Sequence, residues 1–419
     1  MSISASRPQG KLDHLLDGDS FYANPYPAFA QMRAEAPVYW YAPTGIWLIA
    51  KYDDVDTVLR SPKLFSSYGF QNNYFEKMRP ELRSAAPTLE LRGRTPNLIT
   101  SDPPEHTRLR RLLQVAFTPK AVEELRPRVQ ATVGDLLDAV SHQDEIDFVT
   151  SFAYPLPAMI FADIMGVPRE DHEFCKQVSR NVVLFMARNN PNSELTVEFA
   201  READALLARM RDYLREMVED RRNQPRDDLI SALATVEFEG DRLTDDELFT
   251  NLVLFLLAGH ETTTNLIANG LFVLLRHPEQ FQKVRDNREL LAPAMEEILR
   301  FESPVQRVRR VVAEDTELGG VALSVGEPAE TLMGSANRDE TKWDAPDVFD
   351  IEREPFLNLS FGRGTHFCIG ALLARLEATV AFNEIFDRFP KMELAKDWEP
   401  RWATTTNLRT LESLPVKVG

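Results

Sequence analysis

A glycine-rich stretch around one cysteine constrains this chain more than any other feature. Residues 361–370 read Phe-Gly-Arg-Gly-Thr-His-Phe-Cys-Ile-Gly, and three glycines let the backbone bend tightly and approach a flat group closely. The next residues, Ala371 to Ala378, are strong helix formers, so Cys368 is predicted on a loop at the amino end of a helix. There the helix dipole and unpaired N–H groups favour a thiolate, the form of cysteine that acts as a metal ligand.

A buried structural cysteine is the ordinary interpretation of one cysteine before a helix. The full pattern Phe-Gly-x-Gly-x-His-x-Cys-x-Gly is far more specific, and it resembles the haem-binding loop of the cytochrome P-450 superfamily. The resemblance implies haem b (iron protoporphyrin IX) as cofactor and Cys368 as the iron ligand. It also places Phe361, His366 and Gly370 at the haem.

A second pattern interrupts a long apolar helix. The helix is predicted to start at a capping box, Thr244 to Glu247, and to run to about Leu275. Polar residues 259–265 stand in its middle, where unsatisfied polar groups are costly. Gly259 permits a local bulge and a groove for O2 and water. The alternative is a helix kink whose threonines bond back to the preceding turn.

The sequence Ala-Gly-x-Glu-Thr at 258–262 resembles the central-helix signature of the same family. It implies that Glu261 and Thr262 form an acid–alcohol pair that relays protons. Ala258 would contact the haem, and Leu254 would contact the substrate. His260 points about 100° round the helix from Glu261 and is predicted to be structural.

Basic residues at two places are candidates for contact with the two haem propionates. A proline pair opens a helix in which His106 and Arg110, four residues apart, share a face. A histidine and an arginine on one face can hold a carboxylate, although such a pair is more often solvated. The resemblance supports the clamp and adds Arg310, with two close rivals in Arg307 and Arg309.

The pattern Glu-x-x-Arg at Glu297 and Arg300 places two opposite charges on one helix face. Such pairs are usually modest surface salt bridges. Here the pattern resembles the family's Glu-x-x-Arg, which a later arginine, here Arg353, completes. The three residues are predicted to hold the fold on the cysteine side and to take no part in the chemistry.

Residues 61–101 show no clear periodicity, and an irregular segment of this length is usually functional or disordered. In the family this region helps to form the substrate pocket, which makes Arg94, Asn97 and Leu98 candidate contacts, together with Val305 after the Glu-x-x-Arg helix. A solvated loop is an equal alternative for Arg94. Residues 301–306 and 411–417 look like those of bacterial members that act on small aromatic acids, and Arg94 would then anchor a carboxylate.

Composition limits the remaining options. A net charge of −17 argues against nonspecific binding to nucleic acid or to acidic membranes. Two cysteines among 419 residues are too few for a disulfide framework and suit a reducing cytoplasm. Residues 1–20 are polar, without the apolar stretch of a signal peptide or anchor, and are predicted to be a flexible segment before one domain at 21–419.

Several local elements can also be predicted. Residues 38–41 and 46–49 flank a Pro-Thr-Gly turn and read as a hairpin, and residues 28–34 and 52–59 read as helices. Residues 189–192 are a candidate lid tip. Pro328 removes a strand N–H, so the strand that follows is expected to start late or to lie at an edge.

The fold predicted from these patterns is mainly α with small β-sheets, the cytochrome P-450 fold. The implied function is a monooxygenase that inserts one O2-derived oxygen atom into a small organic substrate, such as an aromatic one, by hydroxylation or O-dealkylation. Electrons would come from NAD(P)H through a ferredoxin and a ferredoxin reductase, since no fused reductase domain is expected after Gly419. An H2O2-driven peroxygenase and a non-catalytic haem-thiolate sensor or carrier are the alternatives.

Overall fold

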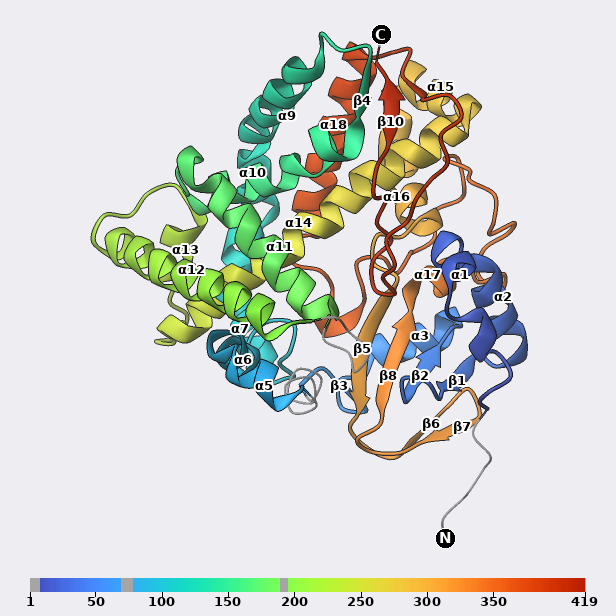
Figure 1. Ribbon diagram of the computed structural model, residues 1–419, viewed down its shortest axis with the longest axis horizontal. Coiled ribbons are helices and arrows are strands. Elements are labelled where there is room, and N and C mark those ends of the chain that lie inside the picture. Colours follow the sequence, from blue (N-terminus) through green and yellow to red (C-terminus); the bar gives the residue numbers. More distant parts are fainter. Residues whose placement is uncertain (1–7, 69–77, 189–194, 419) are drawn as a thin grey trace. The chain divides into compact units, whose positions relative to one another are not determined.

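The computed structural model describes residues 8–68, 78–188 and 195–418 (Figure 1). The chain divides into two compact units. The first comprises Met1–Ser67, Val133–Tyr154 and Thr262–Gly419, and the second comprises Tyr68–Thr132 and Pro155–Glu261. Helices α9 (Arg126–Val140) and α14 (Asp245–Arg276) continue from one unit into the other. The single domain expected for residues 21–419 stays a prediction.

The largest sheet lies in the first unit and has the strand order β1-β2-β8-β5-β3 (Figure 1). Its strands are β1 (Val38–Tyr41), β2 (Ile46–Ile49), β8 (Pro328–Leu332), β5 (Arg307–Val312) and β3 (Phe65–Ser66). The β1–β2 pair is the predicted antiparallel hairpin, with Val38 opposite Ile49 and Tyr41 opposite Ile46. Only the β2–β8 pair is parallel among the described strands of this sheet.

The edge position expected for the strand after Glu327 is wrong. Strand β8 lies between β2 and β5, and it begins at Pro328 itself. The missing N–H is tolerated because proline occupies the first residue of the strand, while the parallel pairing with β2 starts at Ala329.

The flexible segment expected at residues 1–20 stays a prediction, and residues 1–7 lie outside the described part, but two apolar side chains within 8–20 are buried. Leu12 and Leu16 are buried in a cluster with Phe29 of α2 (Tyr26–Glu35). The Tyr39 hydroxyl accepts the N–H of Leu12 at 3.1 Å. Two leucines four residues apart give this polar segment enough apolar surface to dock.

A second cluster in the same unit joins the sheet to the helices beside it. Trp47 and Phe65 from the sheet pack with Val55 of α3 (Tyr52–Arg60) and Met333 of α17 (Met333–Ala336). The remaining elements of this unit are η1 (Asp13–Leu15), α1 (Asp19–Ala23), β4 (Glu145–Asp147), η3 (Val149–Ala153), α15 (Pro278–Asp286), η5 (Arg288–Leu290), α16 (Leu291–Phe301), β6 (Thr316–Leu318), β7 (Val321–Leu323), η6 (Gly364–His366), α18 (Ala371–Arg388), β9 (Glu393–Leu394) and β10 (Pro415–Lys417).

The named elements of the second unit's described part are helices, and α11 (His172–Arg188) runs beside α12 (Val197–Asn223) in it (Figure 1). Its other elements are α5 (Pro80–Ser84), α6 (Pro87–Arg94), α7 (Glu105–Leu113), η2 (Gln114–Phe117), α8 (Pro119–Glu124), α10 (Pro155–Met165), η4 (Arg169–Asp171) and α13 (Leu229–Thr235). The lid tip proposed at 189–192 lies outside the described residues.

The segment 61–101 is more ordered than its sequence suggests. Strand β3 and helices α5 and α6 occupy much of its described part. Both helices have proline at the start of their first turn, where its missing N–H costs nothing. They are five and eight residues long, too short for a hydrophobic period to be recognised in the sequence.

The capping box that opens α14 is present as predicted. The Thr244 N–H donates to Glu247 Oε2 at 2.8 Å, and the Glu247 N–H donates to Thr244 Oγ1 at 3.2 Å. The helix then runs without a break to Arg276, so the bulge that Gly259 permits is not formed. No helix in the described ranges has the length and apolar character that a membrane span requires.

Candidate active site

The loop that carries Cys368 lies between η6 and α18 in the first unit, as its glycines indicate. Gly362 and Gly364 have positive φ angles of 71° and 64°, and a Cβ on Gly364 would come within 2.9 Å of the Leu59 carbonyl oxygen. The Cys368 N–H donates to the Phe361 carbonyl at 2.9 Å and closes the turn. Gly370 is the residue before α18, and a Cβ there would lie 4.0 Å from Cys368 Sγ.

The two cysteines differ sharply in their surroundings. Cys368 is exposed, whereas Cys175 on α11 is 1% exposed. Burial raises the pKa of the Cys175 thiol to about 12, so this group stays protonated. Since cysteine is among the most buried residue types, an exposed cysteine on a glycine-shaped loop indicates a functional thiol.

Polar and basic groups of the first unit complete this part of the site. His366 Nε2 lies 3.1 Å from the Ser67 hydroxyl. Arg310 on β5 is 5% exposed. Its two rivals are engaged elsewhere, because Glu330 of β8 binds both Arg309 and, at 3.3 Å, Arg307. Arg310 donates from Nη1 to the Arg309 carbonyl at 2.7 Å, and its choice over the two rivals as the propionate contact stays a prediction.

Glu330 itself is a buried acid held ionised by its partners. Burial alone would raise its pKa, but the guanidinium groups of Arg309 and Arg307 lower the pKa below the usual value. The two rival arginines thus share one carboxylate, and Nε and Nη2 of Arg307 have no hydrogen-bond partner among the described residues. The donor set of the loop and the strand, an exposed thiol with an imidazole and a guanidinium, fits an iron and the carboxylates of a haem.

Helix α7 of the second unit carries the other pair of candidate propionate contacts. His106 is 1% exposed and Arg110, one turn later, is half-buried. Arg108, between them, belongs to another face and binds Asp241 at 2.7 Å and Glu247 at 2.7 Å. The spacing of His106 and Arg110 thus gives one helix face, as predicted.

In the middle of α14, one face of the helix carries side chains that are only partly buried. Ala258 is exposed, and Glu261 and Thr262, three and four residues later on the same face, are half-buried. Burial raises the pKa of the Glu261 carboxyl, and no charged partner of it is found in the described ranges. His260 is buried and lies 3.4 Å from the Ser179 hydroxyl, which supports the structural role predicted for it.

The candidate substrate contacts differ in how free their side chains are. Asn97 accepts the N–H groups of Ile99 at 3.1 Å and Thr100 at 3.2 Å, so it shapes its own turn. The Leu98 N–H donates to Asn251 of α14 at 3.0 Å. Leu98 and Leu254 are buried apolar side chains of the second unit.

Val305 lies in the first unit, where it forms a bridge with Leu408 and packs against the sheet cluster. Arg94 stands at the end of α6 with its side chain 45% exposed, and it binds Glu90 at 2.9 Å. Its neighbour on the opposite face, Arg92, is 5% exposed. Sequence reasoning missed Arg92, and the only available signal was its helical spacing from Thr88 and Leu89.

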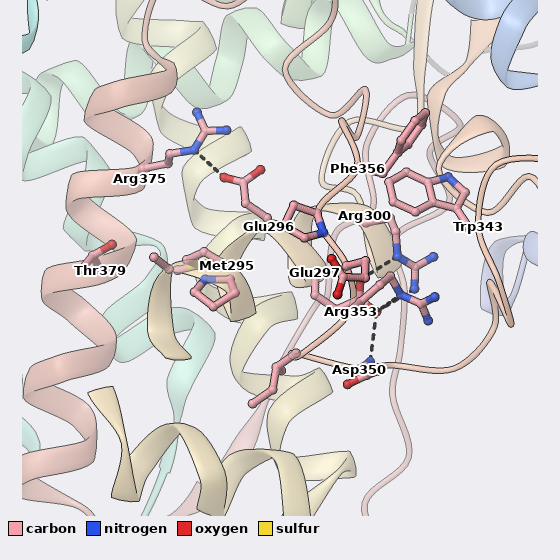
Figure 2. A pocket seen from close by; sticks show the side chains of 15 residues that line it. Met295, Glu296, Glu297, Arg300, Trp343, Asp350, Arg353, Phe356, Arg375 and Thr379 are labelled. Carbon is pink, nitrogen blue, oxygen red and sulfur yellow. Dashed lines mark hydrogen bonds and ion pairs between the residues drawn. The ribbon is translucent and has the colours of Figure 1, made fainter. Parts of the chain in front are cut away.

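The Glu-x-x-Arg residues form a buried network beside a cavity of ≈ 340 Å³, which Figure 2 shows. Arg300 Nε and Nη2 donate to Glu297 at 2.6 and 2.8 Å, and Arg353 Nε donates to the same carboxylate at 3.3 Å. The Asp350 N–H adds a bond of 3.0 Å. Glu296 at the cavity wall is paired with Arg375 at 2.7 Å. The charges are matched, which agrees with the predicted structural role.

Comparison with known proteins identifies the family. The cytochrome P450 family model matches residues 45–411. The chain is 36% identical to cytochrome P450 107B1 of Saccharopolyspora erythraea over 97% of this chain and 98% of that protein. It is also 36% identical to the vitamin D(3) 25-hydroxylase of Pseudonocardia autotrophica, over 98% of both chains.

A solved structure gives the same result at the level of the fold. It is that of P450BioI in complex with a hexadec-9Z-enoic acid ligated acyl carrier protein, with a TM-score of 0.83, 34% identity and coverage of 96% of this chain and 100% of that chain. The matched relatives and this structure each cover more than nine tenths of the chain. The protein belongs to the cytochrome P450 family, and it is a haem b monooxygenase.

Proposed function

We propose that Cys368, as thiolate, ligates the haem iron, and that Phe361 and Gly370 shape the loop around that bond. The proposal is supported above all by the exposure of Cys368 on a loop whose glycines have positive φ angles. When bound, the haem supplies the activation of O2 and the transfer of one oxygen atom to the substrate. In the overall reaction a C–H bond becomes C–OH, and two electrons and two protons reduce the other oxygen atom to water.

Four residues are assigned to the haem propionates. His106 and Arg110 on α7, Arg310 on β5 and His366 in the loop provide two guanidinium groups and two imidazoles for two carboxylates. Guanidinium–carboxylate pairs are strong because charge-assisted bonds can form in parallel. Ala258, exposed on α14, leaves room for a flat group against the helix.

Glu261 and Thr262 are assigned to proton delivery. Burial raises the pKa of the Glu261 carboxyl, so this group holds its proton at a higher pH than an exposed glutamate does. The carboxyl can then give a proton to the adjacent Thr262 hydroxyl, which can pass its own proton on. An acid with a pKa raised towards the working pH is suited to this task.

Substrate contacts are assigned to Leu98, Leu254 and Val305 as apolar side chains, and to Asn97 as the residue that shapes the turn before Leu98. Arg94 is the sequence-based candidate for an acidic substrate group, but it would have to leave Glu90 to serve. The named relatives act on or bind a vitamin D and a fatty acyl chain, which favours a mostly apolar substrate here.

A ferredoxin and a ferredoxin reductase are the proposed source of electrons, with NAD(P)H as reductant, and the proposed location is the cytoplasm. The electron source is tested by reconstitution with a ferredoxin and its reductase. Substrate-dependent NAD(P)H consumption with product formation supports it. A protein reduced by dithionite but not by this pair contradicts it.

The thiolate ligand is tested by the absorption spectrum of the dithionite-reduced protein with and without CO. A Soret band at the long wavelength diagnostic of thiolate ligation is expected for the wild type and for Cys175→Ser. Cys368→His should lose that band. A wild-type band typical of histidine or thiol ligation would overturn the assignment.

A further inference from the structure

Arg92 on α6 is a buried cation with no counter-charge among the residues that the structure describes. Its side chain is 5% exposed, and its Nε has no hydrogen-bond partner among the described residues. No carboxylate in the described part of the chain lies within ion-pair distance of it. A buried, unpaired charge is costly, and proteins keep one only where something else supplies the opposite charge.

The neighbouring arginines on α5 and α6 show that this arrangement is specific to Arg92. Arg83 and Arg94 both bind the carboxylate of Glu90, at 2.6 and 2.9 Å. Their hydrogen bonds lower the pKa of Glu90, with that from Arg83 contributing most. Burial alone, with no charged neighbour contributing, lowers the pKa of Arg92 to about 10, which leaves the guanidinium charged at neutral pH.

The orientation of α6 directs Arg92 inward. Thr88, Leu89, Arg92 and Gly93 are the buried residues of this helix, and they share one face, while Arg94 lies on the other. The Leu89 N–H donates to Asp204 of α12 at 2.9 Å, so the helix is fixed near its amino end, before Arg92.

The chain after Arg92 leads to the face of α14 where the reaction is proposed to occur. Leu98, six residues later, donates its N–H to Asn251 at 3.0 Å. Leu254 and Ala258 lie three and seven residues beyond Asn251 on the same face of α14, so Ala258 is about 10 Å further along the axis. A ligand of moderate length held at α6 would extend along this face.

We propose that Arg92 binds the carboxylate of the substrate, so that the protein oxidises small organic acids. The proposal rests on the monooxygenase function assigned above and names the substrate class of that site. A guanidinium group presents a planar fork that matches a carboxylate. A single cation balances a single negative charge, which favours a carboxylate over a phosphate monoester, whose charge at neutral pH is close to two.

The test compares acids with their uncharged analogues on the haem-loaded enzyme. Straight-chain acids of eight to twelve carbons and 4-substituted benzoic acids, each paired with its primary amide, are titrated by the substrate-induced shift of the Soret band. We expect acids to bind the wild type more tightly than amides. Arg92→Gln should weaken acid binding by at least about 30-fold and leave amide binding unchanged.

Arg83→Gln is the matched control, because it removes an arginine of the neighbouring helix α5 that is partly exposed and paired with Glu90. It should change acid binding less than about twofold. If no acid binds the wild type more tightly than its amide, or if Arg92→Gln keeps the preference for acids, the proposal is overturned. The CO spectrum of each variant separates this outcome from failure of the monooxygenase function, which would remove the thiolate band from the wild type itself.

A second measurement needs no ligand. If Arg92 is kept for binding, Arg92→Met should raise the melting temperature of the ligand-free holoenzyme, on the order of 2 °C, because an apolar side chain of similar volume removes the buried unpaired charge. A lower melting temperature for Arg92→Met would show that Arg92 serves the fold, and would overturn the proposal.

Discussion

Buried charges are treated differently in two regions of this molecule. In the network of Glu297, Arg300 and Arg353, carboxylate and guanidinium groups satisfy one another, and Arg300 also donates to three backbone carbonyl groups. In the second unit, Arg92 is buried and Glu261 is half-buried, and neither has an opposite charge among the described residues. From this difference we infer that a buried charge with an opposite partner stabilises the fold, whereas one without a partner serves to bind a ligand or to carry a proton.

The largest effect is expected from breaking the matched network. Glu297→Ala would leave Arg300, 1% exposed, without its counter-charge, and should cost about 3–5 kcal/mol of unfolding free energy. Urea unfolding of the holoenzyme measures this. Glu296→Ala, next in the chain but 42% exposed and paired with Arg375, should cost at most about 1 kcal/mol. Equal losses in the two variants would contradict the structural role of Glu297.

Glu377 on α18 is an exception to this pattern, because it lies in the first unit and yet is a buried acid without a charged partner among the described residues. It is 4% exposed, its Oε2 has no hydrogen-bond partner in the described ranges, and burial raises its pKa from 4.5 to about 8. A carboxyl whose folded-state pKa is raised stabilises the fold fully below its unfolded pKa, and this contribution is lost as the pH rises towards the folded pKa.

Unfolding free energy should therefore fall between pH 4.5 and about 8, by at most about 1.4 kcal/mol per pH unit from this group. Glu377→Gln should remove that part of the slope. The measurement is urea unfolding of both proteins across this window. If the free energy of unfolding had the same pH dependence in the wild type and in Glu377→Gln, Glu377 would be ionised in the folded protein and would have a partner.

Glu261 and Thr262 provide a kinetic test of the unmatched region. Glu261→Gln should lower turnover by roughly 10²-fold, because a general acid is lost, without lowering stability. Thr262→Ala should form less product and release more H2O2 per NAD(P)H consumed, and Thr262→Ser, which keeps the hydroxyl, should remain coupled. Unchanged coupling in Thr262→Ala would remove this residue from the proton relay.

The smallest effect is expected at Arg94. Its ion pair with Glu90 is exposed, so Arg94→Gln should change unfolding free energy by less than about 0.5 kcal/mol in urea unfolding. Glu90 keeps Arg83 in that variant. A loss above about 1 kcal/mol would show that the exposure of a charged side chain on α6 does not predict its contribution to the free energy of unfolding.

The parts of this protein that could be predicted from its sequence are those whose local structure is determined by residue type and spacing. The Cys368 loop, the capping box of α14 and the Glu297–Arg300 pair are short patterns of this kind, and the structure has each in its predicted local form. The assignment of Arg94 over Arg92 depends on which face of a two-turn helix is buried. Contacts with α12 and α14 determine which face is buried. These helices are distant in the chain, so no local sequence pattern contains this information.

The same limit explains the misplaced edge strand. The neighbours of β8 are β2 and β5, one of them nearly three hundred residues away in the sequence, and proline chemistry alone does not reveal them. Leu12 and Leu16 lie in a buried cluster with residues of α2 and β1, although the surrounding sequence is polar.

Because Cys175 is buried, the reactivity of the protein's two thiols indicates whether haem is bound and whether the chain is folded. Thiol reagents attack thiolates, and a thiol with a pKa of about 12 inside α11 presents almost none. A maleimide should therefore label one site per haem-free folded chain, at Cys368, and none in a chain whose iron occupies that sulfur. A second labelled site would record the opening of α11, so that one simple titration distinguishes loaded, empty and unfolding molecules in the same sample.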